Sequence, residues 1–410
     1  MNPTIKILCG AEPFGFGPCS KLTTILNFIK KFDVSFDFYG KGSAYAFFKQ
    51  NVGEHAIRTE EDIREINQVN YDAVISVMDW EVVAWGYHNK VPVYFFDSLY
   101  WCWNWPPSDR SEIEKRLAKM QGSSFDSLID YLDSLPNHLQ IYAAHYLATK
   151  SYIQYYPTCL RNDGSEEILK PIVIQPMVDL SLKKEEIRDT IVISLSGLQN
   201  PLLNETDIKS YVELIRELTK PVLGMHASNY KIVWAVNEEV IGLAEETLEV
   251  EIRPISQKEF LALLNKTVVL LAPAGITTIY ETIFYETPII ILPEQHNGHY
   301  KNYLNLHNNE NNKVIPQCLI NHRLQLLSPT DPLENTKELF GIYYEMLLGD
   351  REELLKELQQ ELIEQVEYCT GSHGNRMTLV EDQKNVIYSN FGVIDSYQDV
   401  LTNIFTKQYY

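Results

Sequence analysis

The stretch "TVVLLAPAGITTIYETIFYETPIIILPEQH", residues 267–296, contains the pattern that decides the fold. It opens with an apolar run that ends in a small-residue turn at Gly275 and continues with a helical pattern over 277–286. The helical pattern breaks before Pro288, and a second apolar run over 288–293 ends in polar residues. Two continuous apolar runs joined by a helix are typical of a βαβ unit whose strands are parallel and buried on both faces.

The same alternation extends through most of the chain, as its apolar runs and amphipathic segments show. The pattern predicts strands over 4–11, 34–40, 71–79, 91–97, 190–197 and 248–255, and further apolar runs lie at 138–146, 220–227 and 231–237. It predicts helices over 18–31, 41–50, 205–219 and 257–265, and a mostly helical region over 333–410. This β-α-β-α order predicts parallel sheets with helices on both faces, which is an α/β fold.

The chain has 410 residues, which is more than one ordinary hydrophobic core needs. The composition changes between 155 and 190, where a charged patch interrupts the alternation before it restarts. We therefore predict a Rossmann-like domain over 1–180 and a second Rossmann-like domain over 181–375. Helices over 376–410 are expected to pack back on the first domain.

The composition indicates which partners the protein binds. A net charge of −20 repels phosphate backbones and anionic lipids, so the sequence predicts no nucleic-acid partner and no stable membrane association. No apolar run reaches the length of a transmembrane helix. The 6 cysteines lack C-x-x-C spacing, which favours free thiols in a cytoplasmic protein and no metal site. Small molecules are the expected partners, and the sequence does not indicate the oligomeric state.

Ligands of doubly wound sheets bind outside the carboxyl ends of the strands, where Gly275 is predicted to lie. A glycine lets the backbone turn sharply and approach a ligand closely. The helix that follows presents the N–H groups of Ile276, Thr277 and Thr278 at the positive end of its dipole, which suits a phosphate. Glu281 lies one turn further on, where its carboxylate can accept hydrogen bonds from the vicinal hydroxyls of a ribose.

Other strand ends supply further candidate groups. Gly197 follows the first strand of the second domain and offers a second close approach for phosphates. Gln295 and His296 follow the next strand after Glu281 and can reach hexose hydroxyls. The structural alternatives stay open, because Glu281 could be an ordinary surface glutamate and Thr278 could bond within its own helix.

The order of these residues resembles the donor-binding signature of GT-B glycosyltransferases. The nearest resemblance is to the UDP-glycosyltransferases and the peptidoglycan N-acetylglucosaminyltransferase. The matching positions are Gly275, Thr277, Thr278, Glu281, Pro288, Pro293, Gln295 and His296. The resemblance implies a GT-B fold, in which two Rossmann-like domains face a cleft and a helical tail follows.

The resemblance also implies roles for the two domains. The first would bind the acceptor, and the second would bind a nucleotide-diphosphate sugar of the UDP or dTDP type as a co-substrate, with no other cofactor. Ile255 would lie against the nucleobase. His226 occupies the place of a cleft residue of the family, although it could equally be an interior histidine.

Aromatic residues dominate "FFDSLYWCWNWPP", residues 95–107, directly after a predicted strand of the first domain. Aromatic rings stack on sugars and other rings, so Tyr100, Trp101 and Trp103 are predicted to line the acceptor site together with Phe14 of the first loop. The alternative is that these rings form a buried plug between the two domains.

Glycosyl transfer needs a general base for the acceptor hydroxyl. Members of the family often place a histidine in the first loop, but the loop here begins with Glu12 and contains no histidine. Glu12 and Asp97 are the candidate bases, and Asp97, which stands at a strand end, is the favoured one.

These features predict a metal-independent inverting glycosyltransferase acting on a small soluble acceptor. The helix after Gly275 can stabilise the leaving diphosphate without a metal ion, and no D-x-D motif stands at a strand end. Two alternatives remain open. One is a sugar-nucleotide epimerase of the same fold, and the other is a non-catalytic protein that binds sugar nucleotides.

Overall fold

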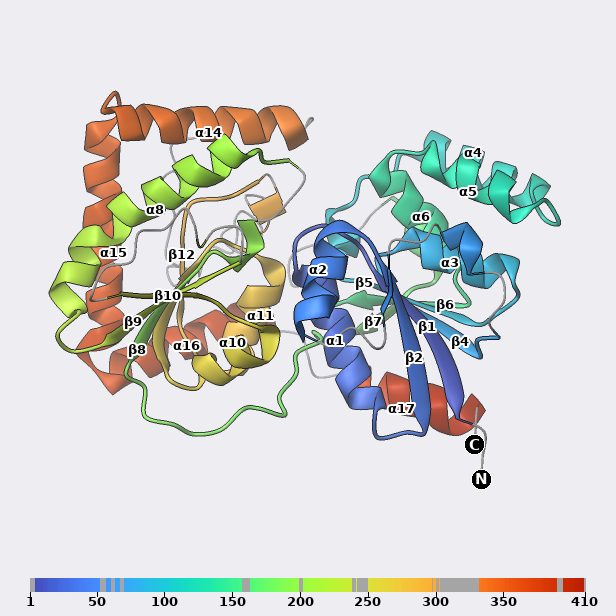
Figure 1. Cartoon of the computed structure of the whole chain (residues 1–410), viewed down its shortest axis with the longest axis horizontal. Helices are drawn as coiled ribbons and strands as arrows, with labels where there is room; N and C mark the ends of the chain where they lie inside the picture. Colours follow the sequence, from blue (N-terminus) through green and yellow to red (C-terminus); the bar gives the residue numbers. More distant parts are fainter. Residues whose placement is uncertain are drawn as a thin grey trace. The chain divides into compact units, whose positions relative to one another are not determined.

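The computed structural model describes residues 4–51, 57–59, 63–66, 70–156, 163–198, 202–237, 241, 250–296, 298, 299, 302, 332–388 and 394–408. The chain divides into two compact units. Unit 1 is Met1–Met177 with Asn390–Tyr410, and unit 2 is Val178–Ser389 (Figure 1).

Unit 1 is built on a parallel sheet with the strand order β3-β2-β1-β4-β5-β6-β7. Its strands are β1 (Ile5–Ala11), β2 (Val34–Gly40), β3 (Ile57–Thr59), β4 (Ala73–Val77), β5 (Val93–Asp97), β6 (Lys150–Gln154) and β7 (Ile172–Ile174). Its α-helices are α1 (Gly17–Ile29), α2 (Gly42–Asn51), α3 (Trp80–His88), α4 (Pro107–Lys119), α5 (Phe125–Asp133), α6 (Asn137–Leu147), α7 (Ser165–Leu169) and α17 (Tyr397–Gln408). Short 3₁₀ turns occupy Ile63–Glu65 and Tyr100–Cys102.

Unit 2 is built on a second parallel sheet with the strand order β10-β9-β8-β11-β12. Its strands are β8 (Thr190–Ser194), β9 (Lys231–Val236), β10 (Val250–Pro254), β11 (Thr267–Ala272) and β12 (Ile289–Ile291). Its α-helices are α8 (Glu205–His226), α10 (Gln257–Leu264), α11 (Ile276–Phe284), α14 (Pro332–Leu348), α15 (Glu352–Gly371) and α16 (His373–Tyr388), and a 3₁₀ turn occupies Ser196–Leu198.

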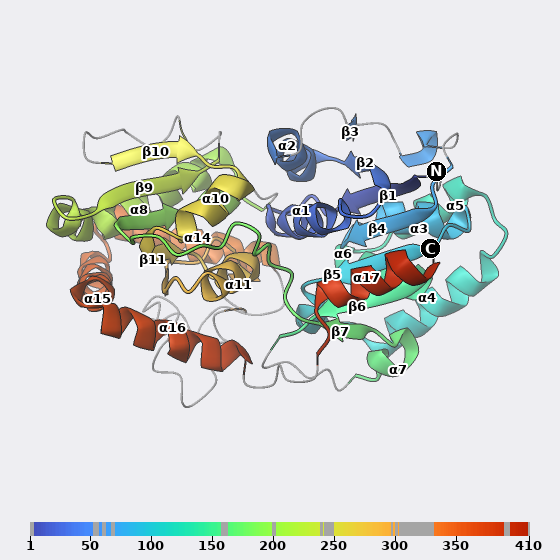
Figure 2. The same cartoon turned by 90° about the horizontal axis from the view of Figure 1, so that it is seen from below.

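Helices cover both faces of each sheet. In unit 1, α1 and α17 lie on one face, and α3 and α6 lie on the other (Figures 1 and 2). In unit 2, α8 lies on the face opposite α10 and α11 (Figure 1). The apolar runs of the sequence form these strands because parallel strands between two helical layers have both faces buried, and every residue of β4, β5, β8 and β11 is buried. The predicted α/β fold of two parallel sheets followed by C-terminal helices is confirmed.

The C-terminal helices belong to different units. Helix α17 packs on α1 and on the turn after it through aromatic pairs. The ring centroids lie 5.9 Å apart for Phe28 and Tyr397 and 5.4 Å apart for Phe32 and Phe405. Helix α16 belongs to unit 2. There the Gln383 side chain accepts a hydrogen bond from Ile289 N of β12 and donates one to Ile289 O. The return of the chain to unit 1 therefore comes with α17.

Each sheet contains one point where the strand order reverses direction. In unit 1 this switch point lies between β1 and β4, and in unit 2 it lies between β8 and β11. Helices leave neighbouring strands toward opposite faces at a switch point, so the loops after those strands separate and leave a crevice at the carboxyl edge. The fold therefore directs attention to the residues after β1, β4, β8 and β11.

Helix α8 is longer than the sequence predicts, since it continues through Pro221 to His226 instead of ending at 219. A proline inside a helix removes one N–H donor and leaves the carbonyl four residues earlier without its helical partner. Here that carbonyl belongs to Glu217, and it accepts a 2.8 Å hydrogen bond from Gln359 Nε2 of α15. A tertiary contact thus compensates for the proline.

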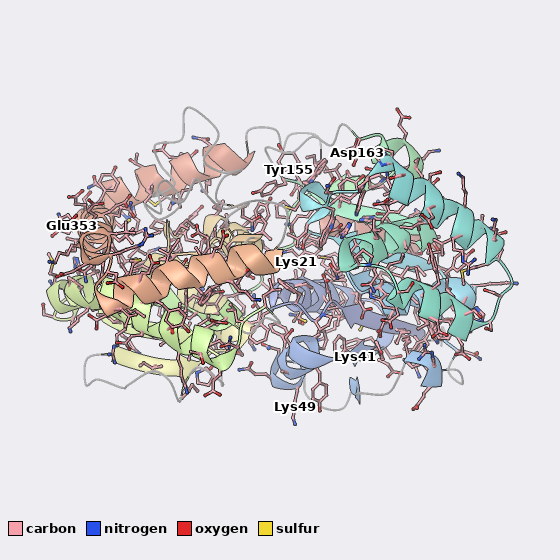
Figure 3. The ribbon with its side chains drawn as sticks, turned by 90° about the horizontal axis from the view of Figure 1, so that it is seen from above. Lys21, Lys41, Lys49, Tyr155, Asp163 and Glu353 are labelled. Carbon is pink, nitrogen blue, oxygen red and sulfur yellow. The ribbon has the colours of Figure 1, made fainter. Side chains whose placement is uncertain are left out.

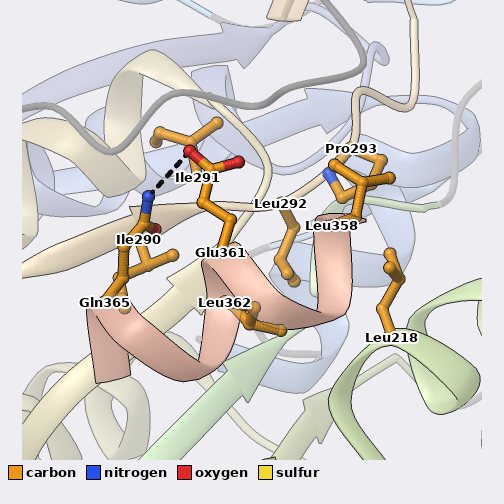
Figure 4. A pocket seen from close by; sticks show the side chains of 9 residues that line it. All are labelled: Leu218, Ile290, Ile291, Leu292, Pro293, Leu358, Glu361, Leu362 and Gln365. Atoms are coloured by element: carbon orange, nitrogen blue, oxygen red, sulfur yellow. Dashed lines mark hydrogen bonds between the residues drawn. The ribbon is translucent and has the colours of Figure 1, made fainter. Parts of the chain in front are cut away.

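A small cavity of about 30 Å³ lies between α8, β12 and α15 (Figure 4). Its walls are mostly aliphatic, with Leu218, Ile290 and Leu362 among them. Gln365 Nε2 donates a 3.1 Å hydrogen bond to Glu361 Oε1 at its rim (Figure 4). A cavity of this volume has room for water but not for a nucleotide sugar.

The cysteines in the described ranges, Cys9, Cys19, Cys102 and Cys369, are free thiols. Cys159 and Cys318 lie outside the described residues. Within the same ranges, no helix combines the length and the apolar character that crossing a membrane requires.

Candidate functional site

Three strand ends of unit 2 meet at the carboxyl edge of its sheet. A Cβ atom added to Gly197, after β8, would lie 3.6 Å from Gln295 Oε1, which follows β12. A Cβ atom added to Gly275, after β11, would lie 3.5 Å from His299 Nε2. The structure therefore brings together Gly197, Gly275 and Gln295, which the sequence placed at separate strand ends.

Helix α11 begins at the switch point of unit 2 without a side-chain cap. Its N-cap is Gly275, and the first intrahelical bond runs from Ile279 N to Gly275 O at 3.0 Å. The N–H groups of Ile276, Thr277 and Thr278 precede this ladder, so helix geometry directs them past the helix end. Such N–H groups, at the positive end of the helix dipole, favour an anionic ligand.

The turn before α11 is held by a residue that the sequence reading missed. Asn302 is buried, and its Nδ2 donates a 2.9 Å hydrogen bond to Ala274 O. This bond fixes the peptide next to Gly275 and therefore the direction in which the first N–H groups of α11 point. No local pattern identifies Asn302, because the bond spans 28 residues.

Glu281 is buried inside unit 2, so the alternative of a surface glutamate is wrong. Its Oε1 accepts a 2.5 Å hydrogen bond from Gln257 Nε2, at the start of α10. Ile255, also buried, stands two residues before Gln257 in the turn after β10. The oxygens of a side-chain carboxyl group can accept further hydrogen bonds, as a ribose would require.

Thr278 keeps its backbone role in α11, because its carbonyl oxygen accepts a 3.0 Å hydrogen bond from Thr282 Oγ1. Its own hydroxyl oxygen would lie 3.8 Å from a Cβ atom added to Gly275. The Thr278 side chain therefore lies beside the glycine turn.

Two buried polar side chains follow β12. Glu294 is fully buried and Gln295 is 1% exposed. Among the described residues, none hydrogen-bonds the side-chain oxygens of Glu294 or either polar side-chain atom of Gln295. Burial raises the pKa of Glu294 to about 8, so its carboxyl group is largely protonated at neutral pH. Unsatisfied buried polar atoms are costly, and at a strand end they are well suited to meet the hydroxyls of a ligand.

His296 and His299 lie against each other, with ring centroids 4.0 Å apart. His296 Nδ1 accepts a 3.0 Å hydrogen bond from Gly298 N, and His299 Nδ1 accepts a 3.4 Å hydrogen bond from Gln295 N. Desolvation lowers the pKa of His296 to about 4 and the pKa of His299 well below its ordinary value. Both rings are therefore neutral near pH 7 and carry no positive charge toward a ligand.

His226 lies away from this group, so its predicted place among the donor-binding residues is wrong. Helix α8 starts after the carboxyl end of β8 and runs back along the sheet, which places its last residue, His226, at the opposite edge. There its ring contacts Tyr230 with centroids 6.0 Å apart, and burial lowers its pKa. The sequence prediction ended the helix at 219, before Pro221, and therefore misplaced the histidine.

Unit 1 carries a buried carboxyl group at its own switch point. Glu12 directly follows β1, is 8% exposed, and its Oε1 accepts a 2.7 Å hydrogen bond from Asn137 Nδ2. The pKa of Glu12 is raised to about 8, mainly by burial. Within this shift, the hydrogen bond from Asn137 lowers the pKa, and the charges of Asp97 and Asp79 raise it. A carboxyl group with a pKa near the working pH suits general acid–base chemistry.

Asp79 stands on the other side of the same switch point and caps α3. Its Oδ1 accepts a 2.9 Å hydrogen bond from Glu81 N, and a Cβ atom added to Gly10 of β1 would lie only 2.6 Å from its Oδ2. Burial and, to a smaller extent, the charge of Glu81 raise the pKa of Asp79 to about 7. Lys41 (Figure 3) pairs with Glu81, its Nζ lying 2.9 Å from Oε1. Gly10 is therefore required for the close packing of β1 against Asp79.

Asp97, the favoured catalytic base in the sequence prediction, is fully buried, and its role as a base stays a prediction. Its Oδ1 accepts a 2.6 Å hydrogen bond from Leu99 N. Its Oδ2 accepts a 2.9 Å bond from Trp103 Nε1 and lies 3.0 Å from His145 Nε2. These bonds occupy the carboxylate and join β5 to α6 and to the loop after β5. Glu12 is thus the better placed of the two candidate bases.

The aromatic stretch after β5 places Tyr100 in the interior of unit 1. Tyr100 is fully buried, and its ring lies 5.3 Å from Trp105 and 5.2 Å from His145. Trp101 is half-buried and donates a 2.8 Å hydrogen bond from Nε1 to Gln154 O. Trp103 is half-buried as well.

Phe14, in the loop after Glu12, is half-buried too. Of the predicted acceptor residues, Phe14, Trp101 and Trp103 thus keep exposed surface, and Tyr100 does not. In the part of the chain that the structure describes, no group of three or more His, Cys, Asp or Glu side chains has the arrangement of a metal site.

Comparisons with known proteins give structural matches alone. No protein-family model matches the sequence, and no curated protein matches it either. Phytolacca americana UGT2, complexed with UDP-2fluoro-glucose and pterostilbene, is 14% identical, with a TM-score of 0.46 and coverage of 92% of this chain and 98% of that one. A UDP-glucose:anthocyanidin 3-O-glucosyltransferase in complex with UDP is 12% identical, with a TM-score of 0.42 and coverage of 94% and 100%.

A further match is the Methanocaldococcus jannaschii UDP-GlcNAc 2-epimerase in complex with UDP-GlcNAc and UDP. It is 15% identical, with a TM-score of 0.42 and coverage of 70% of this chain and 83% of that one.

Proposed function

We propose that the protein is a glycosyltransferase that uses a nucleotide-diphosphate sugar. Unit 2 binds this donor at the carboxyl edge of its sheet, and unit 1 binds a small acceptor and supplies Glu12 as the general base. The observation that carries the proposal is the start of α11, which has no side-chain cap, at the switch point of unit 2, together with the buried Glu281 and the pair Glu294 and Gln295. The polar side-chain atoms of this pair have no hydrogen-bond partner among the described residues.

Each part of the donor corresponds to one feature of this edge. The diphosphate binds the N–H groups after Gly275, because these groups and the helix dipole stabilise negative charge. The ribose hydroxyls donate to Glu281, on the side of Ile255 and the nucleobase. The sugar binds Glu294 and Gln295, whose side chains gain the hydrogen bonds that the described residues do not provide. His296 is neutral and adds a further polar contact to the sugar.

The proposed transfer step uses the carboxyl group of Glu12 and the N–H groups at the start of α11. The Glu12 carboxylate takes the proton of the acceptor hydroxyl as the hydroxyl oxygen forms its bond to the anomeric carbon of the sugar. The bond between that carbon and the diphosphate oxygen breaks, and the N–H groups at the start of α11 stabilise the negative charge that the leaving diphosphate gains. A single displacement of this kind inverts the anomeric centre.

Replacing Glu281 by alanine is expected to weaken nucleotide binding by about 1–3 kcal/mol, the cost of losing hydrogen bonds to a charged group. This corresponds to a Kd for UDP that is about 5- to 150-fold higher. Isothermal titration with UDP and with dTDP measures the change. Glu338→Ala, an exposed residue of α14, is the matched control and should bind as the parent does. Equal affinity for the nucleotide in the Glu281 variant and the parent would show that the ribose does not bind at Glu281.

A second function, sugar-nucleotide epimerisation, is favoured by one observation in unit 1. Glu12, Asp79 and Asp97 follow or end three strands, and the charges of Asp97 and Asp79 both act on Glu12. Epimerisation needs several acid and base groups around one sugar ring.

Incubating the protein with UDP-sugars in the absence of an acceptor separates the two activities. A glycosyltransferase would leave the sugar configuration unchanged or release UDP slowly, whereas an epimerase would convert the donor to its epimer. Tight binding without turnover of any donor would indicate a non-catalytic binding protein.

A further inference from the structure

Glu12 is held by a residue that is distant in the sequence. The hydrogen bond from Asn137 Nδ2 to Glu12 Oε1 is 2.7 Å long and spans 125 residues. Glu12 is buried, whereas Asn137 is exposed as the first residue of α6. Among the described residues, no hydrogen bond reaches the other carboxyl oxygen, Oε2. Asn137 thus covers one oxygen of the carboxyl group and leaves the second one available.

The start of α6 is fixed by contacts on both sides of Asn137. Pro136 is the N-cap, and the carbonyl of His138 accepts a 2.6 Å hydrogen bond from Trp105 Nε1. Gln140 Nε2, one turn further on, donates a 3.1 Å bond to Leu132 O. The backbone that carries Asn137 is therefore anchored to the rest of unit 1 independently of Glu12, and the amide reaches Glu12 from a rigid support.

We infer that Asn137 is the positioning residue of the general base: its amide holds Glu12 Oε1 and orients Oε2 toward the acceptor hydroxyl. The orientation of Oε2 toward an acceptor hydroxyl rests on the proposed function. The contact between Asn137 and Glu12 Oε1 exists without any substrate. An asparagine suits this role because its Nδ2 group donates a hydrogen bond without adding a charge beside the base.

The groups around Glu12 determine what a change at Asn137 does. Asp79 after β4 and Asp97 at the end of β5 raise the pKa of Glu12, and the bond from Asn137 lowers it. From α1, the Cys19 thiol faces the same carboxyl group, and the charge of Glu12 contributes to the raised pKa of that thiol. Exchanging the amide of Asn137 for a carboxylate removes the donor and adds a third negative charge, so both effects raise the pKa of Glu12.

The test uses the full-length protein and the variant Asn137→Asp, which nearly preserves the shape of the side chain. Carbon-13 NMR of labelled glutamate carboxyl groups follows the titration of Glu12, and its signal is assigned by its loss in Glu12→Gln. The midpoint should rise by about one pH unit in Asn137→Asp, because two carboxylates then share one site. Asn27→Asp, at an exposed asparagine of α1, is the control and should leave the midpoint unchanged.

The pH dependence of kcat/KM is then measured for the same proteins with a UDP-sugar donor and an acceptor that the parent uses. In Asn137→Asp the rising limb of this profile should move to higher pH by the same amount as the NMR midpoint. Asn137→Ser keeps a hydrogen-bond donor and should move the limb less. An unchanged NMR midpoint overturns the role of Asn137. A shifted midpoint with an unshifted rate limb leaves the contact intact but overturns Glu12 as the base, so the two failures are distinguishable.

Discussion

Replacing Glu12 by glutamine is expected to lower kcat of sugar transfer about 100- to 10,000-fold, the usual contribution of a general base. Glutamine has the same shape and can still accept the hydrogen bond that Asn137 Nδ2 donates to Glu12 Oε1. It cannot take a proton from the acceptor hydroxyl. The KM for the donor should change little, because Glu12 belongs to unit 1 and the proposed donor site belongs to unit 2.

The pH profile of the parent gives the same test without a mutation. Burial raises the pKa of Glu12 to about 8, and the base form is the ionised one. The value of kcat/KM should therefore rise about tenfold per pH unit below pH 8 and level off above it. A profile that is flat between about pH 6 and pH 9, or a glutamine variant with the kcat of the parent, contradicts the role of Glu12.

Loss of activity in Glu12→Gln should not come from loss of stability. The pKa of Glu12 is about 8 in the folded chain, above the ordinary value for glutamate. The folded state therefore binds more protons than the unfolded state between these two values, and its stability falls as the pH rises through that window. Glutamine removes this penalty. At pH 8 the variant should thus have a free energy of unfolding equal to or above that of the parent.

Replacing Asp97 by alanine is expected to lower the free energy of unfolding by about 3–5 kcal/mol, the cost of removing one partner from a buried polar network. Asp97 accepts hydrogen bonds from Leu99 N and Trp103 Nε1, and His145 Nε2 lies 3.0 Å from its Oδ2. The substitution leaves these donors without their acceptor in a fully buried position. It also separates β5 from α6.

Urea unfolding followed by tryptophan fluorescence measures this loss, because Trp103 and Trp105 report on the region around Asp97. Asp133→Ala, at the exposed end of α5, is the matched control and should change the free energy of unfolding by less than about 0.5 kcal/mol. A stable Asp97→Ala variant with greatly reduced kcat would make Asp97 the base and would exclude the assignment to Glu12.

Much of the fold can be predicted from the sequence, because buried parallel strands require continuous apolar runs. The strands at 4–11, 34–40, 91–97 and 190–197 correspond closely to β1, β2, β5 and β8. The apolar run at 138–146 was harder to assign, since helix α6 is buried almost all round and so lacks an amphipathic pattern. The end of α8 was misjudged, because the contact from Gln359 that compensates for Pro221 comes from a distant helix.

The sequence could predict those residues of the candidate site whose location depends only on their place directly after a strand. Gly197, Gly275 and Gln295 meet because the carboxyl ends of parallel strands share one edge. Glu294 also stands directly after an apolar run. The same argument from strand ends would therefore have identified it as a site residue. The sequence could not show the burial of Tyr100, since its contacts with Trp105 and with His145 of α6 decide it.

Contacts across long sequence separations account for what was missed. Asn137 reaches Glu12 across 125 residues, and Asn302 reaches Ala274 across 28. Neither asparagine belongs to a recognisable motif. The sequence around each of them would accommodate another polar residue of similar size equally well. The preference for Asp97 over Glu12 had the same origin, since both are acidic residues at a strand end and the bonds from Trp103 and His145 decide between them.

The central claim is that the start of α11 holds the diphosphate of the donor. Amide NMR of the nitrogen-15-labelled protein during titration with UDP tests it most directly. The account predicts that the largest changes in chemical shift fall on Gly275, Ile276 and Thr277, with smaller changes at Gly197 and Gln295. Saturable binding of UDP that leaves these amides unchanged, or no binding of UDP, dTDP or their sugars at millimolar concentration, would contradict it.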